Sequence, residues 1–337
     1  MTEIAERPQS ASERARDIAK RVFRHENAAL GIVLIGLILG MGFVTKGLTL
    51  SIANAKNLLV VSSIKGIAAI GQAFVILTAG IDISLGGNAL FCSVLGGGVM
   101  ATNWQNIIDH PLPVAAGALI MLLTAIGWGA FNGTMVSRVG IPALITTLGL
   151  WQITTGGAFW VSAGKSICFQ PDSLVWWGSG TVGGVPVPII IFVAVAVVAY
   201  LVLNHTTYGR SVYAVGGNPV SAWLSGIKVK NVLFSVYVIS GFLSGLVAFI
   251  MLGRVMTASM ASLKGLELDS IAMVVVGGIS LFGGRGNLIG VILGILIIGV
   301  IDNGLRVLNA DPATIGIVKG AIIIAAVVID YMRRRRA

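Results

Sequence analysis

Long runs of apolar residues recur along almost the whole chain, and few polar residues interrupt them. Runs of this kind cover residues 28–48, 57–79 and 186–203. Each of them is long enough to form a helix that crosses a hydrocarbon core of about 30 Å. Because lipid cannot hydrogen-bond exposed peptide groups and the runs do not alternate apolar with polar residues, the pattern predicts membrane-spanning helices and excludes a β-barrel.

We therefore expect an all-α polytopic membrane protein with about ten transmembrane helices. The predicted spans are residues 28–48, 57–79, 88–103, 112–136, 141–163, 186–204, 231–253, 268–282, 287–308 and 313–331. They define a membrane domain over residues 28–331, which is followed by a basic tail at 332–337.

The composition agrees with this fold class, since 56% of the 337 residues are apolar and only 11% are charged. A soluble domain carries about 25% charged residues. The net charge of +10 does not indicate nucleic-acid binding, because the basic residues lie mostly at helix ends and not on one soluble face.

The distribution of lysine and arginine predicts the orientation, because basic loops stay in the cytoplasm. With ten spans both termini share one side, and most of the 23 basic residues fall on that side. These residues are Arg7, Arg14, Arg16, Lys20, Arg21, Arg24, Arg138, Arg210, Lys228, Lys230, Arg285 and Arg333 to Arg336. We expect both termini in the cytoplasm and the protein in the bacterial inner membrane.

Residues 1–27 read as a cytoplasmic, basic and amphipathic segment. Ser10 and Glu13 form a capping box, and Ala15, Ile18 and Val22 share one helical face. The following apolar run is too long for the core of a cleaved signal peptide, which has about 7 to 15 residues.

The chain lacks the residues that an enzyme or a metal site would need at membrane depth. His25, His110 and His205 all lie outside the predicted spans. Gly164-Lys165-Ser166 resembles the end of a phosphate-binding loop, but Phe159 stands where that loop needs its first glycine. We expect no catalytic residue, no metal and no bound cofactor in this chain.

Small residues recur four apart inside the predicted spans. The pairs are Gly129/Gly133, Gly241/Gly245, Gly290/Gly294 and Gly316/Gly320. This spacing lets helix backbones approach closely in lipid. It indicates tight packing within one bundle, with a mobile or dimer-forming interface as the alternative.

Charged residues inside the spans are few, and only Asp82 and Asp302 are carboxylates at plausible depth. Asp302 and Lys319 lie equally far from the outer ends of their spans, so an antiparallel hairpin would bring them together as a structural ion pair. Arg306, four residues after Asp302, is a competing partner. A role in transport is the alternative for this pair. For Lys65 we expect that the side chain reaches the outer interface.

The polar segment at 205–230 is the most informative loop. Asn218 before Pro219 predicts an N-cap with proline in the first helical turn, and Gly226 predicts the helix end. A two-turn helix at 219–225 would present Trp223 and Leu224. Such a short helix is marginal alone, so it either packs on the bundle or docks on a partner.

Four segments resemble motifs of the ribose-type sugar permeases. They are Gly80-Ile-Asp-Ile-Ser-Leu-Gly86, Pro142-Ala-Leu-Ile-Thr-Thr-Leu-Gly149, Thr206-Thr-Tyr-Gly-Arg-Ser-Val-Tyr-Ala-Val-Gly-Gly-Asn218 and Gly277-Gly-Ile-Ser-Leu-Phe-Gly-Gly-Arg-Gly286. They occur in the family's order. The chain is therefore identified as similar to the permease subunits of ATP-binding-cassette (ABC) transporters for carbohydrate import.

The resemblance implies a ten-helix permease that catalyses nothing itself. Its implied partners are a second permease subunit, a cytoplasmic ATPase that carries ATP and Mg, and a soluble sugar-binding protein outside. The ATPase-coupling residues carried over or proposed are Thr206, Gly209, Arg210, Ala214, Gly217, Asn218, Trp223, Leu224 and Gly226. Pro219 and Trp223 stand where relatives often have Glu and Arg, which indicates a more apolar contact with the ATPase.

A sugar path should be lined by hydroxyls, amides and small residues, because sugars offer many weak hydrogen-bonding groups. The candidates are Gln72, Asn88, Asn132, Thr146, Thr147, Gln152 and Thr155. Hydrogen bonding between helices is the alternative for each. Rival functions are a permease for branched-chain amino acids or nucleosides and, in another class, a stand-alone carrier or channel.

Overall fold

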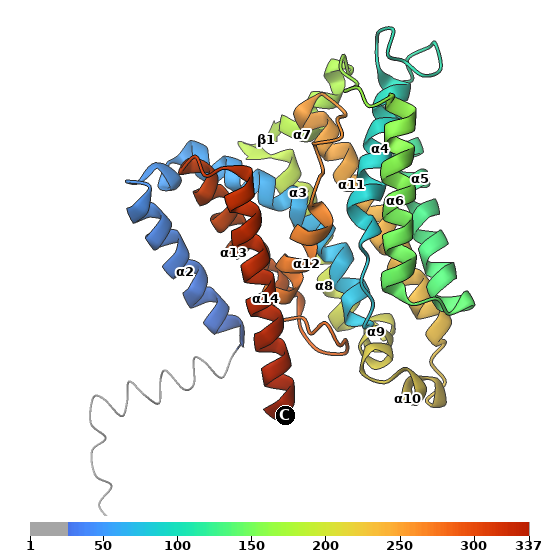
Figure 1. Ribbon diagram of the computed structural model, residues 1–337, viewed down its shortest axis with the longest axis vertical. Coiled ribbons are helices and arrows are strands. Elements are labelled where there is room, and N and C mark those ends of the chain that lie inside the picture. Colours follow the sequence, from blue (N-terminus) through green and yellow to red (C-terminus); the bar gives the residue numbers. More distant parts are fainter. Residues whose placement is uncertain (1–25, 337) are drawn as a thin grey trace, which may run out of the picture.

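The computed structural model describes residues 26–336, and most of them are helical (Figure 1). The longer helices are α2 (Glu26–Val44), α3 (Ile52–Leu77), α4 (Ser84–Met100), α5 (Val114–Thr134), α6 (Ala143–Ser162), α8 (Val187–His205), α11 (Val229–Val255), α13 (Leu288–Val307) and α14 (Pro312–Arg336). The shorter helices are η1 (Leu48–Leu50), η2 (Met135–Val139), η3 (Asp172–Leu174), α7 (Val175–Ser179), α9 (Thr207–Gly217), α10 (Pro219–Leu224) and α12 (Leu266–Val276). The segment predicted at 1–27 lies outside the described residues, except for its last two.

Each of the ten predicted spans overlaps one of these helices, which confirms an all-α polytopic membrane protein. Seven helices in the described part are long and apolar enough to cross a membrane: α2, α3, α5 with η2, α8, α11, α13 and α14. The span predicted at 268–282 is wrong in length, because α12 ends at Val276. Gly277 and Gly278, the latter with φ 87°, end that helix early.

The two ends of the bundle differ in character. Helices α9 and α10 lie at one end, together with the first residues of α2 and the C-terminal end of α14 (Figure 1). The opposite end carries α7 and a hairpin of β1 (Thr181–Val182) and β2 (Val185–Pro186). Gly183 and Gly184, both with positive φ, form the tight turn between these strands.

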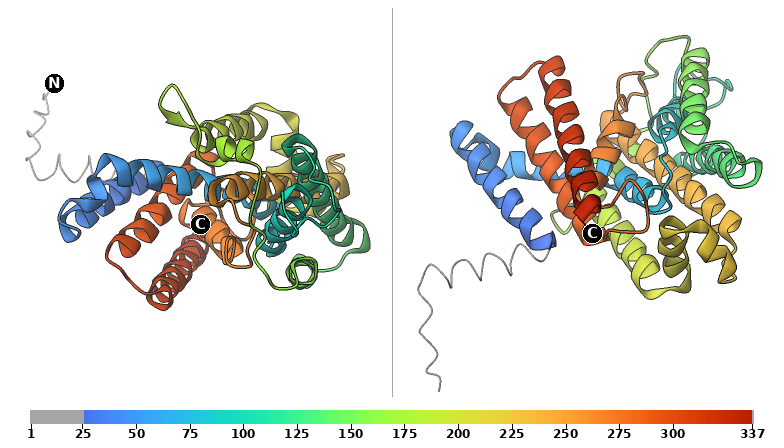
Figure 2. Two further views of the ribbon diagram at one scale, coloured as in Figure 1. Left: turned by 90° about the horizontal axis from the view of Figure 1, so that it is seen from above. Right: turned by 60° about the horizontal axis from the view of Figure 1, so that its bottom comes forward.

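Helix α3 passes through the middle of the bundle, where it packs against α8, α11, α12 and α13 (Figure 2). Its second half, residues 66–77, is entirely buried. Helix α2 stands at one edge and packs mainly on α13, with Phe43 88% exposed. A membrane helix with so much exposed apolar surface faces lipid or another subunit.

Glycines allow several backbones to touch. A Cβ atom at Gly129 of α5 would meet the backbone of α11, and one at Gly294 of α13 would meet the backbone of α12. Both belong to predicted small-residue pairs, so packing within the bundle is confirmed there. At Gly316 and Gly320 of α14 a Cβ would meet nothing within 4 Å, so that pair makes no such contact in the described chain.

Candidate functional site

Helix α9 follows directly on α8 and corrects the expectation of a loop between residues 206 and 218. Thr206 caps it, since its hydroxyl oxygen accepts a hydrogen bond from the Gly209 amide at 3.1 Å. Val212 and Val215 are buried against the bundle. Glycines at 209, 216 and 217 lower the intrinsic helix propensity, and packing of the apolar face compensates for this.

Helix α10 forms as the sequence predicts, one residue shorter than expected. The Asn218 side chain accepts hydrogen bonds from the amides of Val220 and Ser221, both at 3.0 Å. Gly226 has φ 83° and ends the turn. Ala222 is buried against the bundle, whereas Trp223 and Leu224 are 67% and 73% exposed. The helix thus rests on the bundle by one face and presents apolar side chains on the other.

The C-terminal end of α9 packs backbone to backbone against two other segments. A Cβ atom at Gly216 would overlap the Leu77 carbonyl oxygen and approach the Gly284 amide. The Gly284 amide itself donates to the Leu77 carbonyl at 2.9 Å. Tyr213 donates its hydroxyl to the Gly286 carbonyl at 3.2 Å, and burial raises the pKa of this phenol, so it stays protonated.

The turn after α3 connects this region to the interior of the bundle. The Asp82 carboxylate is buried and accepts hydrogen bonds from Ser84 at 2.6 Å and Ser240 of α11 at 2.7 Å. With its amide oriented for hydrogen bonding, Gln72 pairs with both the peptide N–H and C=O of Asp82 at 3.1 Å. The Thr147 hydroxyl of α6 lies 3.2 Å from the Ile81 carbonyl.

All four motif segments therefore meet at one place, which we call the motif junction: residues 77–86, 142–149, 213–218 and 277–286. None of them is adjacent in sequence to another. The junction joins the C-terminal half of α9 to the end of α3, the starts of α4 and α6 and the segment after α12, and Ser240 of α11 contacts it through Asp82. A displacement of α9 would act on the bundle at this junction.

Most of the predicted sugar-path residues are buried inside the bundle. Gln72, Asn132 and Thr147 are fully buried, and Asn88 and Thr146 are nearly so. Asn132 donates to Ser84 at 2.7 Å and Asn88 to the Ala125 carbonyl at 3.2 Å. Gln152 is exposed on α6, and Thr155 is half-buried with no hydroxyl partner among the described residues. Their role as a path stays a prediction.

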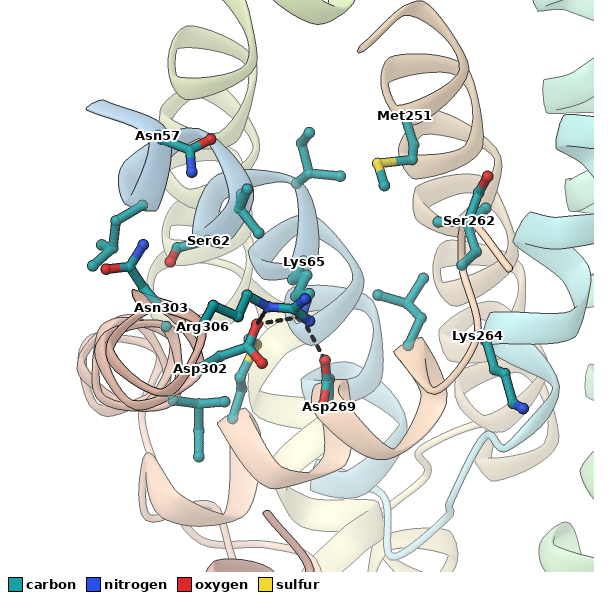
Figure 3. Close-up of a pocket in the computed structure, with 18 of the residues that line it drawn as sticks. Asn57, Ser62, Lys65, Met251, Ser262, Lys264, Asp269, Asp302, Asn303 and Arg306 are labelled. Carbon is teal, nitrogen blue, oxygen red and sulfur yellow. Dashed lines mark hydrogen bonds and ion pairs between the residues drawn. The ribbon is translucent and has the colours of Figure 1, made fainter. Parts of the chain in front are cut away.

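A pocket of about 420 Å³ lies elsewhere, between α3, α11, α12, α13 and α14 (Figure 3). It extends along α3 from Asn57 to Lys65. The polar residues that line it are Asn57, Ser62, Lys65, Arg254, Ser262, Lys264, Asp269, Asp302, Asn303, Arg306 and Lys319. None of the predicted path residues is among them.

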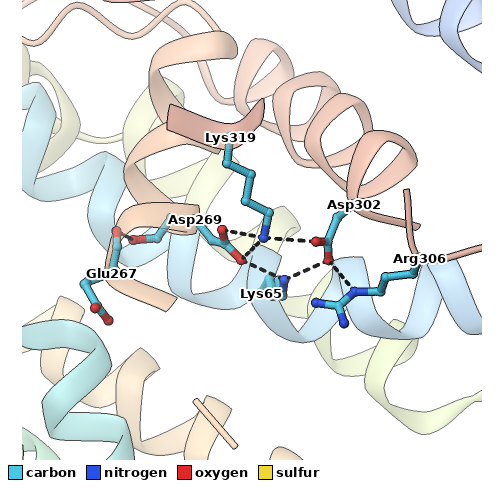
Figure 4. A network of polar contacts seen from close by, with 7 residues as sticks. Lys65, Glu267, Asp269, Asp302, Arg306 and Lys319 are labelled. Atoms are coloured by element: carbon cyan, nitrogen blue, oxygen red, sulfur yellow. Dashed lines mark hydrogen bonds and ion pairs between the residues drawn. The ribbon is translucent and has the colours of Figure 1, made fainter. Parts of the chain in front are cut away.

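Four charged side chains from four helices form a network on the wall of this pocket (Figure 4). We call Lys65 (α3), Asp269 (α12), Asp302 (α13) and Lys319 (α14) the charge quartet. The Lys65 ammonium lies 2.7 Å from Asp269 and 3.2 Å from Asp302. The Lys319 ammonium lies 2.9 Å from Asp269 and 3.0 Å from Asp302. Two lysines and two aspartates thus neutralise one another at one level.

The quartet contains the predicted contact between Asp302 and Lys319 and corrects two other expectations. Lys65 does not reach the interface, because its side chain is only 21% exposed and is held by both aspartates. Asp269 is a third carboxylate at depth, placed by sequence reasoning near the end of its span. The sequence held one signal for Asp269. Lys65 and Lys319 both lie within predicted spans, but Asp302 was the single carboxylate recognised at their depth, so one lysine had no partner. Arg306 also contacts Asp302, at 3.4 Å, and is 63% exposed.

Glu267 lies outside the quartet, on the side of α12 that faces α4 (Figure 4). A Cβ atom at Gly86 would overlap its carboxylate, so the α4 glycine makes room for it. Within residues 26–336, no group of three or more His, Cys, Asp and Glu side chains could hold a metal ion.

The helical bundle, the motif junction and the charged pocket are features of a multi-pass membrane transport protein. The chain belongs to the family described as the permease component of the branched-chain amino acid transport system, which matches residues 54–327. No solved structure matches the chain.

Its curated relatives include three sugar permeases. The fructose import permease protein of Rhizobium meliloti is 36% identical over 314 residues, covering 91% of this chain and 85% of the relative. The ribose import permease protein of Escherichia coli K12 is 33% identical over 288 residues, covering 84% and 87%. The D-allose transport system permease protein of the same strain is 35% identical over 279 residues, covering 83% of each chain.

Proposed function

We propose that this chain is the membrane-spanning permease subunit of an ABC importer that carries a monosaccharide across the inner membrane. The observation that carries the proposal is the convergence of the four motif segments at one junction, in a chain whose relatives import fructose, ribose and allose. The spacing from Thr206 to Asn218 favours a sugar over the branched-chain amino acids or nucleosides of related permeases.

The nine longer helices and the shorter α12 are taken to cross or enter the membrane, which gives ten. The proposed orientation places α9, α10 and both chain ends in the cytoplasm. Supporting this, Arg210 belongs to α9, Arg285 to the motif junction, and Arg138 lies over the Phe234 ring at the start of α11. These basic residues share one end of the bundle, as the positive-inside rule requires.

Helix α10 is the proposed contact for a cytoplasmic ATPase. Its exposed face carries Val220, Trp223 and Leu224, of which Trp223 offers the largest apolar surface. The residues carried over from the family differ in their structural roles around this proposed contact. Thr206 and Asn218 cap α9 and α10, Gly209 packs against α8, and Arg210 is exposed beside them.

The permease itself hydrolyses nothing in this proposal. ATP and Mg bind to the ATPase, and closure of the ATPase dimer moves α9 and α10 against the motif junction. The bundle then alternates between two packings that open to opposite sides. A soluble sugar-binding protein delivers the substrate outside, and a second permease subunit completes the channel.

Uptake into proteoliposomes tests this function. The permease is reconstituted with its ATPase and its binding protein, and uptake of D-ribose, D-fructose, D-allose and L-leucine is measured with and without ATP. We expect ATP-dependent uptake of at least one sugar and none of leucine. ATP-dependent leucine uptake would instead favour a permease for branched-chain amino acids. Uptake by the permease alone would indicate a stand-alone carrier.

A further inference from the structure

The charged pocket ends halfway through the bundle. Lys65 lies at the midpoint of α3, about 20 Å from either end of the helix. Between Asn57 and Lys65 the helix lines the pocket, whereas residues 66–77 are buried without interruption. The pocket is therefore a vestibule that starts at the end of the bundle bearing α7 and closes near mid-depth.

The quartet forms the inner end of this vestibule, at a depth where a charged side chain costs free energy. A charged side chain at the middle of a membrane is destabilising by about 3 kcal/mol or more, so an ionisable residue at this depth points to a functional site. Here four charges from four helices meet at one level (Figure 4). Lys65 is 21% exposed on the pocket side, and Asp302 is 7% exposed.

The polar groups of the vestibule retain capacity to bind a ligand. The two Asp302 carboxylate oxygens each lie against one ammonium group, Oδ2 at 3.2 Å from Lys65 and Oδ1 at 3.0 Å from Lys319. The Lys65 ammonium has three hydrogens and two partners. The buried candidates Asn132 and Thr147 instead direct their donors to groups inside the bundle.

We propose that this pocket is a monosaccharide-binding site of the permease itself and that the charge quartet is its floor. Neighbouring sugar hydroxyls each donate and accept, so they can replace the contacts between a lysine and an aspartate without leaving either charge unpaired. A volume of about 420 Å³ is in the usual range for a small-molecule site. The sugar would separate the quartet, and α12, α13 and α14 would then move apart from α3. The inference rests on the proposed sugar import.

Thiol labelling tests occupancy without altering the quartet. Cys168 is replaced by serine, and Cys92 is buried. Ser262→Cys then places a near-isosteric thiol on the pocket wall, and Ser166→Cys places one on an exposed loop outside the pocket. The probe is whichever sugar the wild-type transporter imports. When the sugar concentration is ten times the dissociation constant of the pocket, the sugar should slow labelling at position 262 about tenfold, because about a tenth of the pockets stay free.

Equal labelling at position 262 with and without that sugar would overturn the site, as would equal slowing at positions 262 and 166. The uptake assay reports the proposed function independently, so failure of transport and failure of the site are distinguished.

A change of specificity tests the quartet itself. Asp302→Asn removes one sugar-facing charge and should change the ratio of uptake rates between two imported sugars about tenfold, because charge-assisted hydrogen bonds depend on hydroxyl position. Asp82→Asn is the matched control, since Asp82 is buried away from the pocket and should slow all sugars by one factor. If Asp302→Asn does not insert, Asp302→Asn with Lys319→Met replaces it. An unchanged ratio in the inserted variant would make the quartet a structural contact only.

Discussion

At the scale of single residues, the quartet is a matter of charge balance. Removing Asp302 leaves two lysines with Asp269 alone, and all three side chains are largely buried. We expect Asp302→Asn to lower the free energy of unfolding by about 3 kcal/mol, since a broken buried pair leaves an uncompensated charge. Adding Lys319→Met should restore much of the loss, because Lys65 and Asp269 remain as a balanced pair 2.7 Å apart.

Thermal unfolding of the purified variants measures this cycle. The matched control is Asp302→Asn with Arg306→Met, which should restore little because Arg306 is 63% exposed and can be hydrated. Rescue by the Arg306 change and not by the Lys319 change would assign the important pair to Arg306.

Two neighbouring glycines give a second prediction at this scale. A methyl group at Gly216 would overlap the Leu77 carbonyl, whereas at Gly217 it would meet nothing within 4 Å. We expect Gly216→Ala to destabilise the fold by about 1–3 kcal/mol or to displace α9, because backbone cannot move aside as a flexible side chain can. Gly217→Ala should unfold at the wild-type temperature. Equal unfolding temperatures for the two variants would show that α9 does not pack at the motif junction as described.

At the scale of elements, α10 is too short to persist by itself. It has six residues, and its stability comes from the Asn218 cap, the Gly226 end and the buried Ala222. Its outer face nevertheless leaves Trp223 67% exposed. Such a surface is consistent with an interface that a partner covers.

We therefore predict that Trp223→Ala leaves the permease folded but weakens its association with the ATPase about 30-fold. An aromatic anchor in an interface is worth about 2 kcal/mol, which corresponds to that factor. Pull-down of the ATPase and sugar-stimulated ATP hydrolysis measure the effect. Trp104→Ala is the control, since Trp104 is 78% exposed between α4 and α5. The segment that joins these two helices lies at the end of the bundle opposite α10 (Figure 1). Normal ATPase binding by the Trp223 variant would contradict the assignment of α10 as the coupling contact.

The elements differ in how far the sequence alone predicts them. Helix α10 could be predicted because Asn218, Pro219 and Gly226 act locally, within one or two turns. Helix α9 could not, because its stability comes from Val212 and Val215 packing on a bundle distant in sequence. The early end of α12 follows from Gly277 and Gly278, but apolar residues beyond them continued the hydropathy signal.

At the scale of the whole molecule, the four motif segments contact one another only in the folded chain. Spacing within each motif was visible in the sequence, but Gly216 and Leu77 are 139 positions apart and touch through backbone atoms. Likewise the Asp302–Lys319 contact could be inferred from matched depths on a hairpin, whereas Lys65 and Asp269 joined it through the packing of α3 against α12. Contacts between helices depend on rotation about each helix axis, which hydropathy does not determine.

The orientation of the molecule is the last prediction, and both the ATPase contact and the outward-facing vestibule depend on it. On a Cys168→Ser background, single cysteines at Val139, Ser225 and Ala337 test the proposed cytoplasmic end, next to Arg138, near Lys228 and next to Arg336. Ser173→Cys, beside Asp172 and exposed, tests the opposite end. In intact cells an impermeant thiol reagent should label position 173 alone, because the membrane shields the other three. After permeabilisation all four should react, which controls for thiols that are merely buried. Labelling of position 225 from outside would show that the bundle has the opposite orientation. Helix α10 would then lie on the side without an ATPase, and the vestibule would face the cytoplasm.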